Sequence, residues 1–324
     1  MEAVAAGALN APASRHQSNQ RQAMSDLEIV DAHHHFWDLD ALYYPWLTDQ
    51  RIKSFPFGNY DILKKNYLPD DYWRDAENHN VIKTVHIEAD RHVDDPLDET
   101  NWLTALHEKE GVPNAIVAYA PMTHDTTEEI LARQSANPLV RGVRAKPVVS
   151  NSPDESVAGQ PGTMQDQAWL DNLALFEKYS LAWDLRVPYW HLEEAAEVAR
   201  ALPSVQVILN HAGLPWDRSE AGLDVWRRGV EAVAACKNVT TKISFLLLPD
   251  GPWDDDQNAR IIRETIEIFG VDRSMFASNY PVDRLRASFD TIYSLFKRTV
   301  SDFPIEDQRK LFSENAIREY RIDS

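Results

Sequence analysis

Short apolar runs alternate with longer amphipathic stretches from about residue 26 to the end of the chain. Apolar runs of roughly four to eight residues are typical of buried strands, and apolar residues spaced three or four apart are typical of helices. The predicted strands are Leu27–His33, Ile82–Glu88, Ala115–Ala120, Leu139–Ala145, Leu181–Val187, Val205–Asn210, Val239–Ser244 and Met275–Ser278. Helices are predicted over segments that include Asn101–Glu110, Thr126–Gln134, Gln167–Lys178, Leu192–Ala201, Ala221–Ala235 and Asp256–Phe269.

This order of elements predicts an α/β fold. A strand followed by a helix, repeated eight times, indicates a parallel sheet that closes into a (β/α)8 barrel. The alternative is an open, doubly wound sheet. That fold needs a glycine-rich phosphate-binding turn after its first strand, whereas the first strand here ends in histidines.

The length fits one such barrel. The chain has 324 residues, and α/β barrels use roughly 250 residues as a single domain. We therefore assign residues 26–324 to one domain. Residues 1–25, rich in Ala, Ser, Asn and Gln, are expected to form a mobile tail ahead of Met24, which could itself be a start. Arg15 and Arg21 give weak support to an organelle-targeting peptide instead.

Charge and cysteine content exclude several classes of protein. Lys and Arg number 33 against 51 Asp and Glu, a net charge of −18, which repels phosphate backbones and anionic lipid. No apolar run approaches the roughly 18 residues of a membrane span. The single cysteine, Cys236, excludes an intrachain disulfide framework and fits a reducing compartment. We expect a cytoplasmic protein that binds a small-molecule substrate, with no nucleic-acid or membrane partner; a homo-oligomer is compatible with the sequence.

Polar residues collect where the predicted strands end, and in a barrel these ends face one shared mouth. Alternation along a strand places His33 and His35 on one face and His34 on the other. Neutral imidazoles on one face can share a single divalent ion, such as Zn or Mn. A packed or solvated cluster is the alternative, but His211, at the end of another strand, favours a site.

The second predicted strand carries His86 and Glu88 on one face. A carboxylate inside the barrel would need a cation or a proton, because an unpaired buried charge is costly. Arg144, Lys146 or a metal ion could supply it. Glu88 is therefore either a catalytic group or one half of a structural ion pair.

Several of these segments resemble the amidohydrolase superfamily, in particular its lactonase-like branch. That branch contains enzymes similar to fuconolactonase and rhamnonolactonase, together with 2-pyrone-4,6-dicarboxylate lactonase. The resemblance covers residues 29 to about 320. Its motifs are Ile29–Asp38, Tyr44–Leu47, Arg141–Arg144, Asn210–Pro215, Phe276–Val282 and Leu311–Phe312 with Asn315–Ala316.

The resemblance implies a distorted, amidohydrolase-like barrel whose site is lined by His33, His35 and His211. In members that use a metal these histidines bind one divalent ion, and other members polarise the lactone carbonyl with protein groups. The binuclear pattern of the superfamily needs another histidine at the end of strand five. This chain reads Trp183–Arg186 there, without histidine, so a binuclear centre is not expected.

One departure from the family concerns the base. The family usually presents an aspartate at the end of strand eight, where this chain has Asn279. Asparagine cannot take a proton at neutral pH, although it can orient water. We expect Asp283 or Glu88 to replace the base; a histidine base or different chemistry are the alternatives. Asp283 could instead be the N-terminal residue of a helix over Arg284–Arg298.

Cations and aromatic rings near the mouth are candidates to bind substrate. Guanidinium groups hold carboxylates through two parallel hydrogen bonds, and aromatic rings suit a sugar face or a planar lactone, although they also cap cores. The candidates are Trp37, Tyr44, His86, Arg144, Lys146, Arg186, Tyr280 and Arg284. The Ser-, Gly- and Pro-rich segment 150–165 is a predicted lid.

Together these features predict a hydrolase that opens a lactone of a sugar acid or of a small polar carboxylate, by attack of water on a polarised carbonyl. A lactone isomerase or a metal-dependent decarboxylase could use the same scaffold. A non-catalytic barrel that binds a small ligand, having lost its base at position 279, is a further alternative.

Overall fold

The computed structural model describes residues 27–53, 55–92 and 95–323. Within them, eight parallel strands are hydrogen-bonded in the order of the sequence. They are β1 (Ile29–His34), β2 (Val81–Ile87), β3 (Ala115–Ala118), β4 (Val140–Val143), β5 (Ala182–Leu185), β6 (Val207–Leu209), β7 (Val239–Ile243) and β8 (Ser274–Phe276). A bridge between His34 and Tyr280, just after β8, joins the last strand to the first. The predicted (β/α)8 barrel is confirmed.

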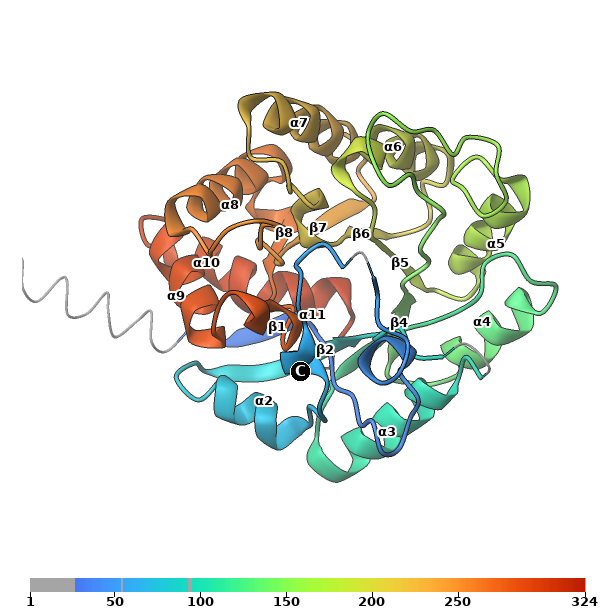
Figure 1. The fold of residues 1–324 in the computed structure, drawn as a ribbon, viewed down its shortest axis with the longest axis horizontal. Coiled ribbons are helices and arrows are strands. Elements are labelled where there is room, and N and C mark those ends of the chain that lie inside the picture. Colours follow the sequence, from blue (N-terminus) through green and yellow to red (C-terminus); the bar gives the residue numbers. More distant parts are fainter. Residues whose placement is uncertain (1–26, 54, 93–94, 324) are drawn as a thin grey trace, which may run out of the picture.

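Helices form a ring around the strands, and loops cross the centre of the face seen in Figure 1. They are α2 (Pro69–Asp75), α3 (Asp98–Glu110), α4 (Thr127–Ser135), α5 (Gln167–Lys178), α6 (Leu192–Ala201), α7 (Glu220–Ala234), α8 (Asp255–Phe269), α9 (Phe289–Thr299), α10 (Ile305–Arg309) and α11 (Asn315–Glu319). Short 3-10 turns lie at Pro45–Leu47, Asp61–Leu63, Tyr189–His191, His211–Gly213, Val271–Arg273 and Val282–Leu285, and a π turn lies at Lys310–Glu314.

One predicted helix begins later than expected. The chain after β8 first makes the 3-10 turn Val282–Leu285, and α9 starts at Phe289. Ser288 caps α9 by accepting a hydrogen bond from the amide of Thr291 at 3.0 Å, as N-cap serines do. Asp283 is therefore not the first residue of this helix. The predicted tail over residues 1–25 lies outside the described residues.

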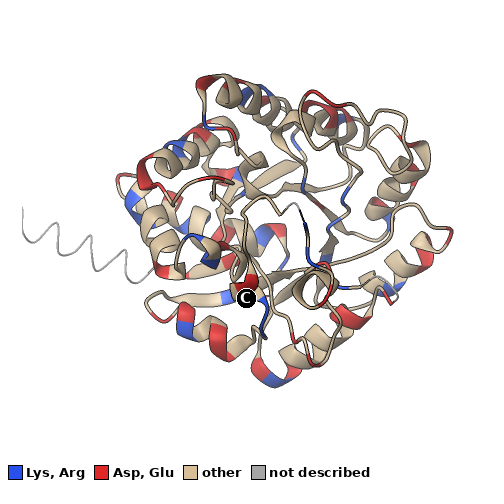
Figure 2. Cartoon of the chain, in the orientation of Figure 1, with Lys and Arg blue, Asp and Glu red and all other residues tan. Residues whose placement is uncertain are grey.

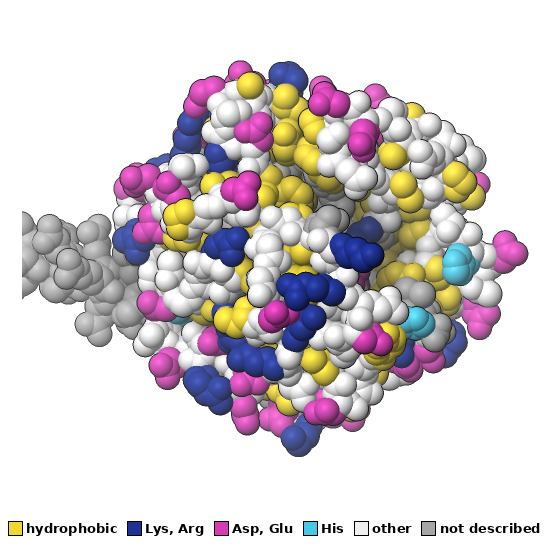
Figure 3. Space-filling view, in the orientation of Figure 1, with side chains coloured by type: hydrophobic (Ala, Val, Ile, Leu, Met, Phe, Trp, Pro, Cys, Tyr) yellow, Lys and Arg dark blue, Asp and Glu magenta, His cyan; other side chains and the backbone are white. Residues whose placement is uncertain are grey.

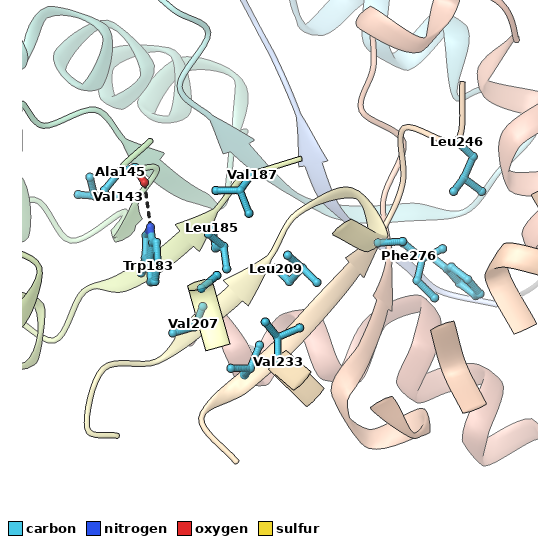
Figure 4. Close-up of a cluster of buried hydrophobic side chains, with 14 of the residues drawn as sticks. Val143, Ala145, Trp183, Leu185, Val187, Val207, Leu209, Val233, Leu246 and Phe276 are labelled. Atoms are coloured by element: carbon cyan, nitrogen blue, oxygen red, sulfur yellow. Dashed lines mark hydrogen bonds between the residues drawn. The ribbon is translucent and has the colours of Figure 1, made fainter. Parts of the chain in front are cut away.

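Alternation along the strands divides the buried side chains into two layers. Trp183, Leu185, Val207 and Leu209 belong to the layer between the strands and the helices, as does Phe276 (Figure 4). Trp183 donates its indole N–H to the carbonyl of Ala145 at 2.8 Å, so even this large ring has its polar atom satisfied. The intervening strand residues, such as Ile208 and Met275, form a second cluster inside the barrel.

The C-terminal segment closes the barrel interior at the end away from the mouth. Ala316, Tyr320 and Ile322 pack into the inner cluster. The hydroxyl of Tyr320 donates to the Asp184 carboxylate, with oxygen–oxygen distances of 3.1 and 3.2 Å. Lys242 forms an ion pair with the same carboxylate, and all three side chains are fully buried. Asp184 is thus surrounded by partners, as a buried charge must be.

Charges of both signs lie along the outer helices and loops (Figure 2). No helix in the described part of the chain is long and apolar enough to cross a membrane.

Candidate functional site

A cavity of about 260 Å³ opens among the C-terminal ends of the strands. Its polar lining comes from residues at or just after strand ends: His35, Asp90, Arg144, Arg186, His211 and Asn279. Its apolar lining comes from the loops: Trp37, Trp46, Ile52, Phe55, Pro56, Phe57, Ala89, Trp216, Phe245 and Val282. In the space-filling view, hydrophobic side chains are visible between charged side chains near the middle of the molecule (Figure 3).

The three histidines of the sequence analysis come together. The ring of His33 lies 5.1 Å from that of His35 and 4.5 Å from that of His211, between ring centroids. The relative accessible area of His33 is 0%, and both of its ring nitrogens lack a hydrogen-bond partner among the described residues. His35 and His211 line the cavity, with His33 beside them.

Hydrogen bonds orient the two histidines of the cavity. Nδ1 of His35 lies 2.8 Å from the carbonyl oxygen of Ile87, so Nδ1 carries the proton and Nε2 keeps its lone pair. Nδ1 of His211 pairs with the hydroxyl of Ser244 at 2.9 Å. Such bonds fix the ring orientation of histidines that bind a metal ion or a substrate through the other nitrogen.

These histidines are neutral at physiological pH. Burial, followed by the charge of Arg144, lowers the pKa of His35 to about 3. Burial also lowers the pKa of His33 and that of His211 well below their ordinary value, helped by Lys242 and Arg186 respectively. Neutral imidazole is the form that binds metal. Among the described residues, however, no group of three or more His, Cys, Asp or Glu side chains is arranged to hold a metal ion.

The backbone is strained where several cavity residues sit. Asp90, His211, Phe245 and Asn279 have positive φ angles of 55°, 62°, 51° and 53°. Asparagine and aspartate tolerate this left-handed conformation, whereas His211 and Phe245 adopt it at a cost of about 1 kcal/mol or more. Residues held in this way cluster at functional sites, which supports the assignment of this cavity.

Asn279 joins the cavity to a buried carboxyl group. Its amide nitrogen donates to Asp283 Oδ1 at 2.7 Å, while Asp283 Oδ2 is buried without a hydrogen-bond partner among the described residues. Burial raises the pKa of Asp283 well above its ordinary value, although the hydrogen bond from Asn279 opposes this. Asp283 does not itself line the cavity.

Glu88 belongs to an ion-pair network with Arg144 and Lys146. Its Oε1 lies 2.6 Å from Nε of Arg144 and 3.1 Å from Nζ of Lys146, and its Oε2 accepts from the amide of Asp90. Burial alone would raise the pKa of Glu88, but the charges of Arg144 and Lys146 outweigh it and lower that pKa. A carboxylate so strongly stabilised as the anion is a weak base.

Arg186 differs from Arg144. It lines the cavity next to Arg144, and within the described chain it makes no hydrogen bond or ion pair. Burial, followed by repulsion from Arg144, lowers its pKa. The guanidinium nevertheless remains charged at neutral pH, so it can receive an anionic group of a ligand.

Five predicted substrate-binding residues lie outside the cavity lining, and Lys146 is the fifth. Tyr44 is fully buried and donates to Glu99 at 2.9 Å. His86 packs against Phe36 on the helix side of β2, because its neighbours in the strand occupy the barrel interior. Tyr280 is buried and donates to the carbonyl of Ala287 at 3.3 Å, and Arg284 forms an ion pair with Asp75 and packs on the rings of Tyr67 and Tyr280.

Lys146 and the predicted lid lie beside the cavity rather than over it. Lys146 pairs with Glu88 and Asp90 and lines a neighbouring cavity of about 240 Å³, which shares Arg144. Within the segment 150–165, Pro161 and Gly162 line this second cavity.

Several cavity residues are not among the candidates that the sequence predicts. Phe55, Phe57 and Phe245 form much of the apolar lining, and Asp90 forms part of the polar one. The closely spaced aromatic residues in Phe55-Pro56-Phe57 were the available signal. They fit neither a helical nor a strand period, so nothing placed them relative to the strand ends.

A parallel eight-stranded barrel with histidines at the ends of β1 and β6 defines a (β/α)8-barrel protein of the amidohydrolase type. A model of the amidohydrolase family, Amidohydro_2, matches residues 30–322, and the chain belongs to this family. It is 36% identical over 299 residues to a protein of Sinorhizobium fredii named uncharacterised protein y4mH. The alignment covers 92% of this chain and 100% of that protein.

More distant relatives have assigned names. The chain is 25% identical over 308 residues to the L-fucono-1,5-lactonase of Burkholderia ambifaria, covering 91% of this chain and 96% of that enzyme. Among solved structures, it is similar to an amidohydrolase of Burkholderia multivorans with bound zinc. The TM-score is 0.75 at 23% identity, over 91% of this chain and 99% of the other.

Proposed function

We propose that this protein is a hydrolase that opens a lactone by attack of water on its carbonyl carbon. The observation that carries the proposal is the meeting of His33, His35 and His211 with Asn279 and Arg186 at one cavity in the barrel mouth. A relative named as a lactonase, aligned along almost its whole length, supports the same class of reaction.

The proposed reaction adds one water molecule and needs no further reactant. The water oxygen bonds to the acyl carbon, the acyl–oxygen bond of the ring breaks, and the ring oxygen takes up a proton. The product is an open hydroxy acid. Arg186, with Arg144 beside it, holds a carboxylate of the substrate. His211 donates from Nε2 to the developing oxyanion while its Nδ1 accepts from the hydroxyl of Ser244, and one such donor contributes about 2.7–4 kcal/mol to the transition state. Nε2 of His35 keeps its lone pair and faces the attacking water.

The proton of the attacking water passes to Asp283 in this proposal. Asn279 orients the water through its amide oxygen, since its amide nitrogen is bonded to Asp283. One bridging water connects the attacking water to the carboxylate. A carboxyl group with a raised pKa is a better base near neutral pH than Glu88, whose pKa is lowered.

The chemistry of the three histidines suits one divalent ion such as Zn or Mn, although the described side chains are not arranged around a common metal position in this structure. His33 has two buried ring nitrogens without partners, and His35 and His211 keep Nε2 available. Neutral imidazoles are preferred ligands of zinc. When bound, such an ion polarises a carbonyl or lowers the pKa of water. The similar amidohydrolase of Burkholderia multivorans contains zinc.

A panel of lactones with a pH indicator tests the proposal, because ring opening releases acid. The panel combines aldonolactones with alkyl, aryl and carboxylated butyrolactones. We expect turnover of at least one member, and a loss of about 100-fold or more in kcat for Asp283→Asn. Turnover of none, or release of carbon dioxide from a small unsaturated acid, would point to the isomerase or decarboxylase alternatives.

Plasma emission on protein purified without chelator tests the metal. We expect about one divalent ion per chain, by analogy with single-ion sites. The ion should be lost in His33→Ala and retained in the control His107→Ala, which changes a histidine outside the cavity. Full activity in protein that contains no ion would eliminate the metal while leaving the hydrolase proposal in place.

A further inference from the structure

The aromatic residues of the cavity wall offer a ligand an apolar surface. The indole N–H of Trp37 donates to the carbonyl of Lys65 at 2.7 Å, and that of Trp46 donates to the carbonyl of Ala89 at 2.9 Å. The indole nitrogen of Trp216 is buried and has no partner among the described residues. These rings therefore offer apolar contact without hydrogen bonding. Phe55, Phe57 and Phe245 extend the same surface.

Most polar atoms on the floor already have partners. Asn279 uses its amide nitrogen on Asp283, Arg144 bonds to Glu88, and Asp90 pairs with Lys146. The groups left for a ligand are Nε2 of His35 and of His211, the amide oxygen of Asn279, the guanidinium of Arg186, and single atoms of Arg144 and Asp90 that their ion pairs do not use. In the proposed function the first three serve the ester group and the attacking water. Arg186 is the cation of the lining that makes no hydrogen bond or ion pair within the described residues.

We propose that the substrate is a lactone with an apolar body, aryl or alkyl, and a single carboxylate that binds Arg186, and that it is not a polyhydroxylated sugar lactone. This inference rests on the proposed function and specifies its substrate class. A sugar lactone carries several hydroxyls, and those that face the aromatic wall would lose their hydrogen bonds to water without gaining a partner in the protein.

The size of this discrimination follows from the cost of unpaired polar groups. Burying a hydroxyl without a hydrogen bond weakens binding by roughly 5- to 150-fold, so two such hydroxyls reduce kcat/KM by about 25-fold or more. Whereas the wall disfavours hydroxyl groups of the ligand, Arg186 favours a carboxylate. A guanidinium that lines the cavity and makes no ion pair within the described residues is stabilised by a carboxylate, which can form two hydrogen bonds to it.

Three lactones test the proposal: γ-phenyl-γ-butyrolactone-β-carboxylate, its carboxamide, and the polyhydroxylated L-fuconolactone. We expect kcat/KM for the aryl carboxylate to exceed that for the sugar lactone by about 25-fold or more. The carboxamide should be slower than the carboxylate by at least tenfold, because it removes the charge that binds Arg186.

Arg186→Gln separates the charge contribution from the apolar one. In this variant the ratio of carboxylate to carboxamide kcat/KM should fall to near one, while the aryl lactones remain better than the sugar lactone. The matched control is Arg228→Gln, which changes an exposed arginine on α7. It should leave every ratio as in the wild type.

The outcomes distinguish this inference from the proposed function. Hydrolysis of L-fuconolactone at least as fast as the aryl carboxylate would overturn the substrate class and leave the hydrolase in place. Hydrolysis of none of the three would count against the hydrolase. In that event, binding measured by tryptophan fluorescence still decides the substrate class: tighter binding of the aryl carboxylate supports it, and equal or weaker binding overturns it.

Discussion

Asn279 and Asp283 share one hydrogen bond just after the last strand, with 2.7 Å between Asn279 Nδ2 and Asp283 Oδ1. The amide lets this contact form beside a buried carboxyl group without adding a second negative charge. The left-handed backbone of Asn279 also suits asparagine better than most residues. The amide therefore has both an electrostatic and a conformational reason to occupy this position.

Replacing Asn279 by Asp should lower activity. Two carboxyl groups in contact cannot both ionise, so one keeps a proton at neutral pH. We expect kcat to fall by about tenfold or more. The pH at which kcat rises should also shift upwards. The control Asn101→Asp adds the same charge at an exposed position of α3. A faster Asn279→Asp enzyme would show instead that the wild type has lost a base it needs.

At this scale the sequence predicted the histidines but not the roles of the other polar residues. His33, His35 and His211 follow from strand ends and alternation, which the chain displays directly. The alternation did not reveal which face of β2 is internal, so His86 was placed at the cavity although it packs against Phe36. For Glu88 the sequence named Arg144 and Lys146 as possible partners, and the structure shows both ion pairs. It left a catalytic role open, because the partners lie more than fifty residues away and no local pattern decides between the two roles.

At the scale of elements, the C-terminal segment that follows α11 closes the barrel. Tyr320 reaches the buried Asp184 and completes a cluster that also holds Lys242. Burial lowers the pKa of Lys242 to about 8 against the attraction of Asp184. Because burial disfavours the charged form of Lys242, the Lys242–Asp184 ion pair is stable only while the carboxylate of Asp184 keeps its hydrogen bonds.

Tyr320→Phe should destabilise the protein because it removes a hydrogen bond from a buried carboxylate. We expect the free energy of unfolding to fall by about 1–3 kcal/mol in urea denaturation. Tyr179→Phe is the matched control, since its hydroxyl bonds to Glu128 at the surface, and it should change stability by less than about 0.5 kcal/mol. Equal effects of the two substitutions would contradict a special role for Tyr320.

The regular elements were predictable because apolar periodicity is a local property. The 3-10 turn at Val282–Leu285, which delays α9, and the wall-forming stretch 37–57 have no such period. Their conformations depend on contacts with distant parts of the chain. Arg286, for example, reaches the carbonyl of Phe57 at 3.0 Å.

For the whole molecule, buried acids make stability depend on pH. Glu99 on α3 accepts hydrogen bonds from Tyr44 and from the amide of Ala89. Burial, followed by the charge of Glu88, raises its pKa to about 8. Between the ordinary value of 4.5 and this raised value, the folded protein keeps a proton that the unfolded chain releases. The stability contributed by Glu99 is therefore complete below pH 4.5 and is lost as the pH rises towards 8.

Glu99→Gln should remove this dependence, because glutamine keeps an acceptor oxygen and does not titrate. Relative to the wild type, the variant should gain on the order of 3 kcal/mol in unfolding free energy between about pH 5 and pH 8. Urea denaturation at both pH values measures the change. Glu231→Gln, at an exposed position of α7, is the control. A parallel pH response of wild type and Glu99→Gln would refute the raised pKa.

The polar and the apolar lining of the cavity come from different parts of the sequence. Its polar groups are distributed over many strand ends, whereas six of its apolar side chains lie within the single stretch 37–57. Recombination or a short insertion in that stretch would therefore exchange ligand preference in one evolutionary step and leave the histidines untouched. Homologues that differ mainly there should accept different molecules with the same chemistry, and a chimera made by grafting the stretch offers a direct route to redesign.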